Sequence, residues 1–114
     1  MLLAGCYSQQ KTSSQITGKK FRWVDPFEKE FETSCEIHFN SSTTFTYHCR
    51  MHHFGTTAKG IWKVIPDKKL IVIEVTGTDI LPTYPEKFYK TKDTILILSE
   101  TIVSHNGKVF KSVE

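Results

Sequence analysis

The feature that most constrains the fold is a segment, residues 34–50, whose polarity alternates on both sides of a polar cluster at residues 40–43. Such alternation is typical of two strands joined by a turn. If Ser42 is the tip of that turn, one face carries Cys35, Ile37, Phe39, Phe45, Tyr47 and Cys49, and polar side chains occupy the other. The segment therefore predicts an antiparallel hairpin with one buried face.

The same register places Cys35 directly opposite Cys49. Directly opposed positions bring Cβ atoms to about 4.5–5.5 Å, and a modest adjustment then reaches disulfide geometry. We expect a Cys35–Cys49 disulfide in an oxidising compartment. The alternative is a pair of reduced core cysteines in a cytosolic protein.

The remaining sequence from residue 19 onward has the pattern of further strands and turns. Strands are expected at residues 19–24, 34–40, 44–50, 59–65, 70–75, 87–90 and 94–98, before a final hairpin with Asn106-Gly107 at its turn. The expected cross-strand pairs are Val64 with Ile71, Trp62 with Ile73, and Val103 with Phe110. The other face of residues 59–75 carries Ile61, Lys63, Ile65, Leu70, Val72 and Glu74, a mixture suited to a partly covered surface or an internal cavity.

One short helix is expected near the N-terminus, at residues 26–33, with Asp25 as its N-cap and Pro26 at its first position. It could cover one end of a barrel. About eight short strands in a chain of 114 residues indicate an all-β fold. A small antiparallel up-and-down barrel is favoured because closure leaves no exposed strand edge.

A second signal lies at the N-terminus, where Leu3-Ala4-Gly5-Cys6 precedes an abruptly polar segment. The four residues resemble the lipobox of bacterial lipoproteins, which are cleaved before an acylated cysteine. The resemblance implies a lipid on Cys6 and a residual signal peptide at residues 1–5. The polar composition that follows indicates a flexible tether at residues 6–18, and the strand pattern indicates a single barrel domain at residues 19–114. The apolar start is shorter than an ordinary signal peptide of about 15–30 residues. The alternative is an accidental apolar start with a buried thiol.

The order of the strands is similar to that of small lipocalin-like lipoproteins. The matching features are Gly60-x-Trp62, the strand with Leu70, Val72 and Val75, a Pro-containing loop, residues 93–98 and the closing Asn-Gly hairpin. The resemblance implies a lipocalin-like barrel that binds or scaffolds. The sequence contains no nucleophile elbow, phosphate-binding Gly loop or zinc-protease motif, and we expect no enzymatic activity. Its 15 basic and 12 acidic residues are interspersed, so we expect no nucleic-acid partner.

Four of the five histidines lie within residues 38–53. Imidazole and carboxylate groups suit zinc or copper, and the predicted register brings several of them to one face. The candidate ligands are His38, His48, His52, His53 and Glu36. The alternative is a solvated polar face, in which case no cofactor is expected.

Aromatic residues around Pro85, namely Tyr84, Phe88 and Tyr89, form a candidate cavity rim or partner surface, and the alternative is core filling. Together these patterns predict a non-enzymatic lipoprotein of the cell envelope. It would be attached through Cys6 to the outer membrane, facing the periplasm or the cell surface, with a barrel that binds a small apolar ligand or an envelope protein. The alternatives are a zinc- or copper-binding or sensing lipoprotein, and a periplasmic lysozyme-inhibitor-like protein.

Overall fold

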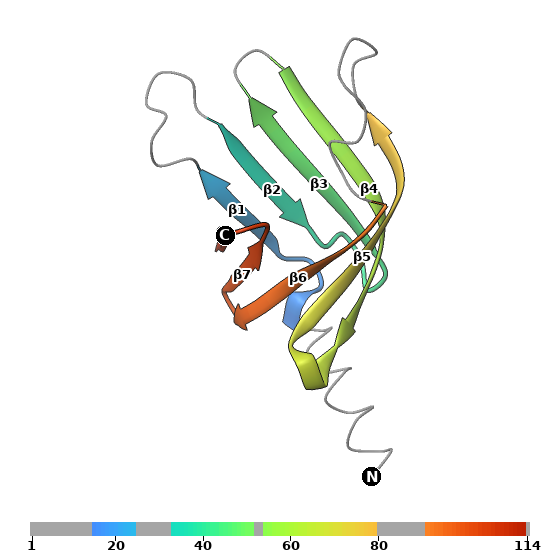
Figure 1. Cartoon of the computed structure of the whole chain (residues 1–114), viewed down its shortest axis with the longest axis vertical. Coiled ribbons are helices and arrows are strands. Elements are labelled where there is room, and N and C mark those ends of the chain that lie inside the picture. The colour runs from blue at the N-terminus through green and yellow to red at the C-terminus, as the bar shows by residue number, and fades with distance from the viewer. Residues whose placement is uncertain (1–14, 25–32, 52–53, 80–90, 114) are drawn as a thin grey trace.

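In a computed structural model, eight antiparallel strands form a closed barrel in which each strand pairs with the next and β8 pairs with β1 (Figure 1). The structure describes residues 15–24, 33–51, 54–79 and 91–113. The strands are β1 (Lys20–Val24), β2 (Ser34–His38), β3 (Thr44–Met51), β4 (Phe54–Ile65), β5 (Leu70–Asp79), β6 (Lys92–Ser99), β7 (Ile102–His105) and β8 (Lys108–Val113). The predicted all-β up-and-down barrel is confirmed.

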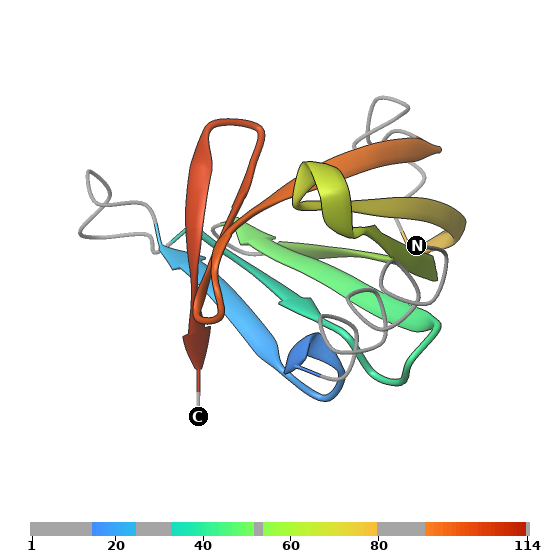
Figure 2. The same ribbon diagram turned by 90° about the horizontal axis from the view of Figure 1, so that it is seen from below.

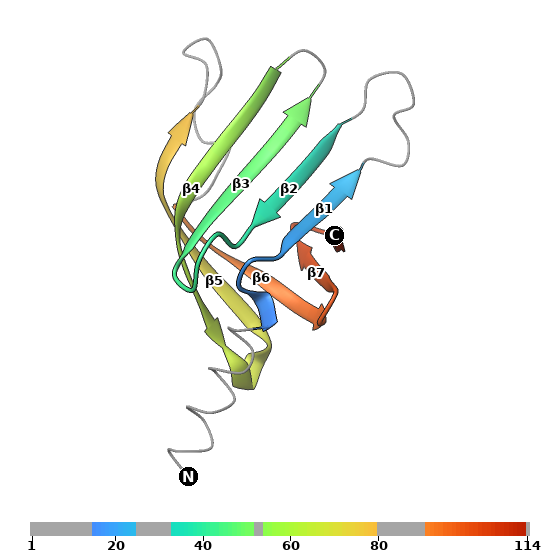
Figure 3. The same cartoon turned by 180° about the vertical axis from the view of Figure 1, so that it is seen from behind.

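The predicted hairpin forms β2 and β3 with the expected register. Cys35 lies opposite Cys49, and Ile37 lies opposite Tyr47. Cys35 and Cys49 form a disulfide, with their Cα atoms 4.0 Å apart. A crosslink over 14 residues of sequence separation contributes about 3 kcal/mol in the loop-entropy account. Figure 3 shows β1 to β4 side by side, with this hairpin at the centre of that wall.

The two later hairpins also have the predicted pairings, Val64 with Ile71, Trp62 with Ile73, and Val103 with Phe110. The turn between β7 and β8 has positive φ at both central residues, 51° at Asn106 and 76° at Gly107. Two such residues define the type I′ turn that matches the twist of a hairpin. A short 3-10 helix, η1 (Pro66–Lys68), joins β4 to β5.

The bounds of β4 and β5 differ from the prediction. β4 begins at Phe54 and β5 ends at Asp79, whereas the sequence pattern predicted a start at residue 59 and an end at residue 75. The added residues of β4 pair with β3, and Gly77, Thr78 and Asp79 of β5 pair with Lys59, Ala58 and Thr57 of β4. Such ladder hydrogen bonds depend on neighbouring strands, so the local composition does not report them.

Aromatic side chains fill one end of the barrel, where the connection between β2 and β3 lies. The ring of Phe39 packs edge-on against Phe21 at 5.9 Å and against Trp62 at 4.8 Å between centroids. The indole Nε1 of Trp62 donates a 3.0 Å hydrogen bond to the carbonyl oxygen of Ser41. This bond satisfies the polar atom of a side chain that is otherwise buried.

The residues before β1 pack against the same end of the barrel. Ile16 is 4% exposed and belongs to the core, and Gly18 donates its backbone N–H to Phe39. Gln15 and Lys19 both bind Glu100 in the turn between β6 and β7. The last residues of the tether expected at residues 6–18 therefore belong to the folded domain. Ile16, the one aliphatic residue among residues 7–18, buries its side chain in the core.

Two predicted elements lie outside the described residues. The expected helix at residues 26–33 falls there except for Thr33, which precedes β2, and the expected strand at residues 87–90 falls there entirely. Both stay predictions.

Gly60 and Gly77 provide a matched test of the bulge in the β4–β5 ladder, where the register shifts between Lys59 and Gly60. A Cβ on Gly60 would collide with the backbone of Glu74, whereas a Cβ on Gly77 would meet the side chain of Lys59 at 3.3 Å. We expect Gly60→Ala to lower the free energy of unfolding by about 1–3 kcal/mol. Gly77→Ala should change it by less than about 0.5 kcal/mol. Urea unfolding measures both, and equal effects would contradict this account.

Candidate functional site

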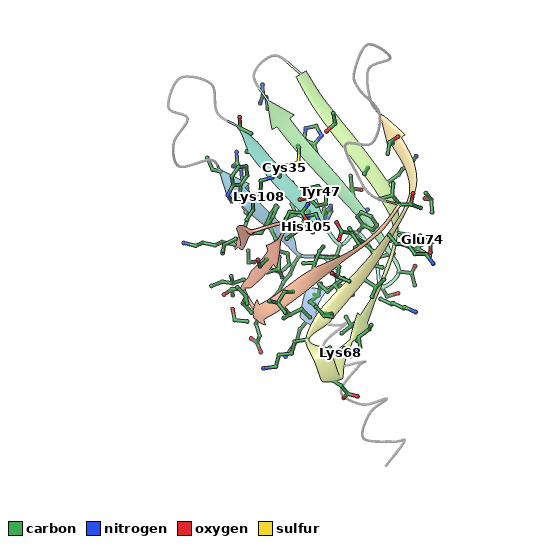
Figure 4. The ribbon with its side chains drawn as sticks, in the orientation of Figure 1. Cys35, Tyr47, Lys68, Glu74, His105 and Lys108 are labelled. Atoms are coloured by element: carbon green, nitrogen blue, oxygen red, sulfur yellow. A yellow bond between two sulfur atoms is a disulfide. The ribbon has the colours of Figure 1, made fainter. Side chains whose placement is uncertain are left out.

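A chain of three polar side chains crosses the barrel interior. The hydroxyl of Tyr47 on β3 lies 2.8 Å from Nδ1 of His105 on β7, and Nε2 of His105 lies 2.8 Å from Oδ2 of Asp93 on β6. His105 is 6% exposed, and the side chain of Asp93 is 16% exposed. Figure 4 shows Tyr47 and His105 side by side within the barrel. Three separate strands are therefore joined by one buried hydrogen-bonded chain.

The carboxylate of Asp93 determines how the protons are arranged along this chain. A carboxylate oxygen accepts, so Nε2 of His105 carries a proton and donates it to Asp93. Nδ1 then accepts from the hydroxyl of Tyr47. Both ring nitrogens of His105 are engaged inside the barrel, and Tyr47 and His105 are only 3% and 6% exposed. The arrangement suits a structural link between strands better than general acid–base catalysis.

The aromatic contacts of Tyr47 hold the chain in place. Its ring packs edge-on against His105 at 5.2 Å and against Phe110 at 5.9 Å between centroids. Edge-to-face pairs of this kind contribute about 0.5–1.5 kcal/mol beyond area burial.

A cation–π contact joins β8 to β1. Lys108 has the same inward orientation as Phe110 on β8, and its Nζ lies 5.0 Å from the ring centroid of Trp23. A cation over an indole face is a favourable contact.

Sequence reasoning missed Asp93 and His105 as site residues. In the sequence, position 105 directly precedes the Asn106-Gly107 turn, and position 93 directly precedes the strand predicted at residues 94–98. The alternation contained the signal, because His105 lies two residues after Val103 and Asp93 two residues before Ile95. Val103 and Ile95 are both fully buried, so their neighbours of the same parity also face inward.

The predicted metal ligands are brought together only in part. Glu36 lies opposite His48, as predicted, and His38 lies opposite Thr46. Nδ1 of His48 bonds the hydroxyl of Thr57 at 2.8 Å. Among the described residues, no three His, Cys, Asp or Glu side chains are grouped closely enough to hold a metal ion. His52 and His53 lie outside the described residues, so the zinc or copper site stays a prediction.

The other predicted site residues, Cys6, Tyr84, Phe88 and Tyr89, also lie outside the described residues. No helix within the described ranges is long and apolar enough to cross a membrane.

A groove of about 250 Å³ lies on the outer surface of β4 and β5. Ile61 lies opposite Glu74, and Lys63 lies opposite Val72. Ile61 is 48% exposed, so its side chain is directed outward. The residues that line the groove are Thr43, Ile61, Trp62, Lys63, Val72 and Glu74. The mixed face predicted from the sequence is thus a partly exposed outer surface and not the wall of an internal cavity.

Comparisons of this chain with known protein families, curated proteins and solved structures found no match.

The buried chain makes a direct prediction for stability. Tyr47→Phe removes the hydroxyl that donates to His105 and leaves Nδ1 without that partner, so we expect a loss of about 1–3 kcal/mol in the free energy of unfolding. His105→Leu removes both hydrogen bonds, and Tyr47→Phe should cost less in that background. A double-mutant cycle by urea unfolding measures the coupling, expected at about 1 kcal/mol. Additive losses would show that the contact contributes nothing.

Proposed function

We propose that this protein is a lipid-anchored, non-enzymatic binding protein of the cell envelope. In this proposal the barrel is a rigid scaffold, and its partner is a protein that binds the groove between β4 and β5. The observation that carries the proposal is the groove itself, an exposed apolar concavity beside side chains of opposite charge, Lys63 and Glu74. Apolar anchors surrounded by polar groups are typical of protein interfaces.

The size of the groove favours a protein over a small apolar ligand. Its volume of about 250 Å³ is below the roughly 300–1,000 Å³ of small-molecule sites. A single apolar side chain of a partner suits a concavity of this size. Lys63 and Glu74, on neighbouring strands, would orient that partner through charge complementarity.

The packing of the interior favours the same choice. Four phenylalanines, Phe21, Phe39, Phe45 and Phe110, are at most 1% exposed and occupy the inside of the barrel. Among the described residues, every buried side-chain nitrogen or oxygen has a hydrogen-bond partner. A ligand inside the barrel would have to displace such contacts, whereas a partner on the outer face would not.

The location in the cell envelope is supported by two separate features. Leu3-Ala4-Gly5-Cys6 resembles a lipobox, and the Cys35–Cys49 disulfide is typical of proteins outside the reducing cytosol. Metal binding and lysozyme inhibition stay as alternatives from the sequence, and no contact among the described residues favours either.

Acylation is tested by the intact mass of the full-length protein extracted from the membranes of its host. We expect a chain that begins at Cys6 and carries lipid, and we expect Cys6→Ser to move the protein into the soluble fraction without a lipid mass. The double variant Cys35→Ser/Cys49→Ser is the control, because it removes the other two cysteines and should leave the lipid in place. A wild-type protein without lipid would overturn the anchor.

The groove is tested by photo-cross-linking in intact cells. With p-benzoylphenylalanine at position 61, we expect a discrete protein adduct, and Lys63→Glu/Val72→Asp should lower its yield at least about tenfold, since both changes disrupt the lining. Val109, which is 46% exposed against 48% for Ile61, is the matched control position and should give no such adduct.

The alternative of a small apolar ligand is tested with the dye N-phenyl-1-naphthylamine. Two results together would contradict the protein partner and indicate a ligand inside the barrel. They are dye binding that Lys63→Glu/Val72→Asp leaves unchanged, and the absence of a protein adduct from position 61. Unchanged thermal unfolding of the double variant confirms that it is folded.

A further inference from the structure

Apolar side chains gather on one side of the barrel exterior. Six large hydrophobic residues of the described chain are exposed, and five of them lie on β1, β6 and β8. These five, between 40% and 52% exposed, are Val24, Leu96, Leu98, Val109 and Val113. The sixth, Ile61, lies in the groove on β4. Isolated apolar residues are common on protein surfaces, but such a concentration on adjacent strands indicates an interaction site.

The strand register makes these residues a continuous surface. Leu96 on β6 lies opposite Ser104 on β7, which in turn lies opposite Val109 on β8. On the next pair of strands, Val113 lies opposite Lys20. The outward-facing residues of β6, β7, β8 and β1 therefore form one curved face, which we name the basic apolar face.

Basic residues alternate with the apolar ones on this face. Lys111 lies opposite Arg22 in the ladder between β8 and β1. The exposed basic side chains of the four strands are Lys20, Arg22, Lys92 and Lys111. The carboxylate of Asp93 on β6 is turned inward to His105. On the flanking strands, Glu36 of β2 lies opposite Arg22, and Glu74 of β5 lies opposite Lys92. Among the described strand pairs, Lys20 and Lys111 have no acidic residue opposite them.

The alternation defines the chemistry of the occupant. It must offer apolar groups to the valines and leucines and negative charge to the lysines and the arginine. The surface of a bilayer with anionic lipids offers both within a few ångströms, because long basic side chains reach the headgroups while short apolar ones enter the boundary of the acyl chains.

The chain before β1 leaves the barrel beside this face. Gln15 bonds Glu100 at 3.1 Å, and Glu100 lies in the turn that joins β6 to β7. Cys6 precedes Gln15 by nine residues. A fully extended chain of nine residues is about 30 Å long. A lipid on Cys6 would keep the basic apolar face within reach of the bilayer.

We propose that the basic apolar face of β6, β7, β8 and β1 docks on an anionic lipid surface. The proposal deepens the proposed function, on which the anchor argument rests. In a ring of eight strands, β4 and β5 lie across from β8 and β1 (Figure 2). Figure 4 likewise places Glu74 and Lys108 at opposite sides of the barrel. With β8 and β1 against the membrane, the groove between β4 and β5 is directed away from the bilayer toward a partner.

The test uses the full-length Cys6→Ser protein, which has no lipid of its own, in sedimentation with vesicles. We expect binding to equimolar phosphatidylglycerol and phosphatidylcholine, and at least about tenfold weaker binding to phosphatidylcholine alone or at about 0.5 M salt. Lys20→Glu/Lys111→Glu should lower binding to the anionic vesicles at least about tenfold. The matched control is Arg50→Glu/Lys59→Glu, which makes the same charge change on exposed positions of β3 and β4 outside the groove and should retain most of the binding.

A second variant separates the apolar contribution from the charge. Leu96→Ser/Leu98→Ser keeps the net charge and should weaken binding several-fold. Thermal unfolding of each variant confirms that the barrel is intact. Equal losses from the charge variants on β1/β8 and on β3/β4 would show that net charge alone governs binding, and this would overturn the proposal.

Binding that does not distinguish anionic from neutral vesicles would also overturn the proposal. An absence of vesicle binding would overturn the proposal as well. In that case, a protein adduct from p-benzoylphenylalanine at position 109 would indicate that an acidic protein binds this face instead. Because the vesicle test uses unacylated protein and leaves the groove unchanged, its failure is distinguishable from a failure of the acylation test or of the cross-linking from position 61.

Discussion

The pairing of β8 with β1 closes the sheet, and the other features of the structure depend on that closure. Once the ladder is a ring, each of the eight described strands pairs with a neighbour on both sides. Alternate residues of each strand then face inward and outward, so the position of a residue along its strand decides whether its side chain lies in the core or on the surface. The disulfide between β2 and β3 strengthens the wall at a point where both cysteines have inward parity.

The interior of the closed barrel contains an aromatic cluster and a chain of hydrogen-bonded polar side chains. Phe21, Phe39 and Trp62 pack edge-on near one end, with Ile16 in the same core. Tyr47, His105 and Asp93 link β3, β7 and β6 through two hydrogen bonds of 2.8 Å. A buried polar chain of this kind stabilises only if every member is satisfied. The chain joins β3 to β6 and β7 across the interior, and under the proposed function recognition takes place on the outer surface.

The outer surface has two sides with different chemistry. On β4 and β5 a small groove lies beside a lysine and a glutamate, which suits a protein partner under the proposed function. On β6 to β8 and β1 the exposed apolar side chains alternate with basic ones, which suits an anionic lipid surface under the further inference. In the ring of strands, β4 lies across from β8 and β5 across from β1, so under the two proposals one lipid-anchored domain contacts a membrane and a partner together.

Local pattern was sufficient wherever a contact joins residues that are close in sequence. Alternation on both sides of Ser42 determined the register of β2 and β3 and hence the disulfide, and Asn106-Gly107 determined the final turn, because a hairpin's pairing is set by its own turn. The barrel class followed from the number of such strands. By contrast, the contact of Tyr47 with His105 spans 58 positions, and Ile16 is buried by residues distant in sequence. Whether the mixed face of β4 and β5 lines a cavity or a surface was likewise decided only by the tertiary structure. These features depend on how the ring closes and which strands meet across its interior, and the local pattern carries no information about distances between strands that are not neighbours.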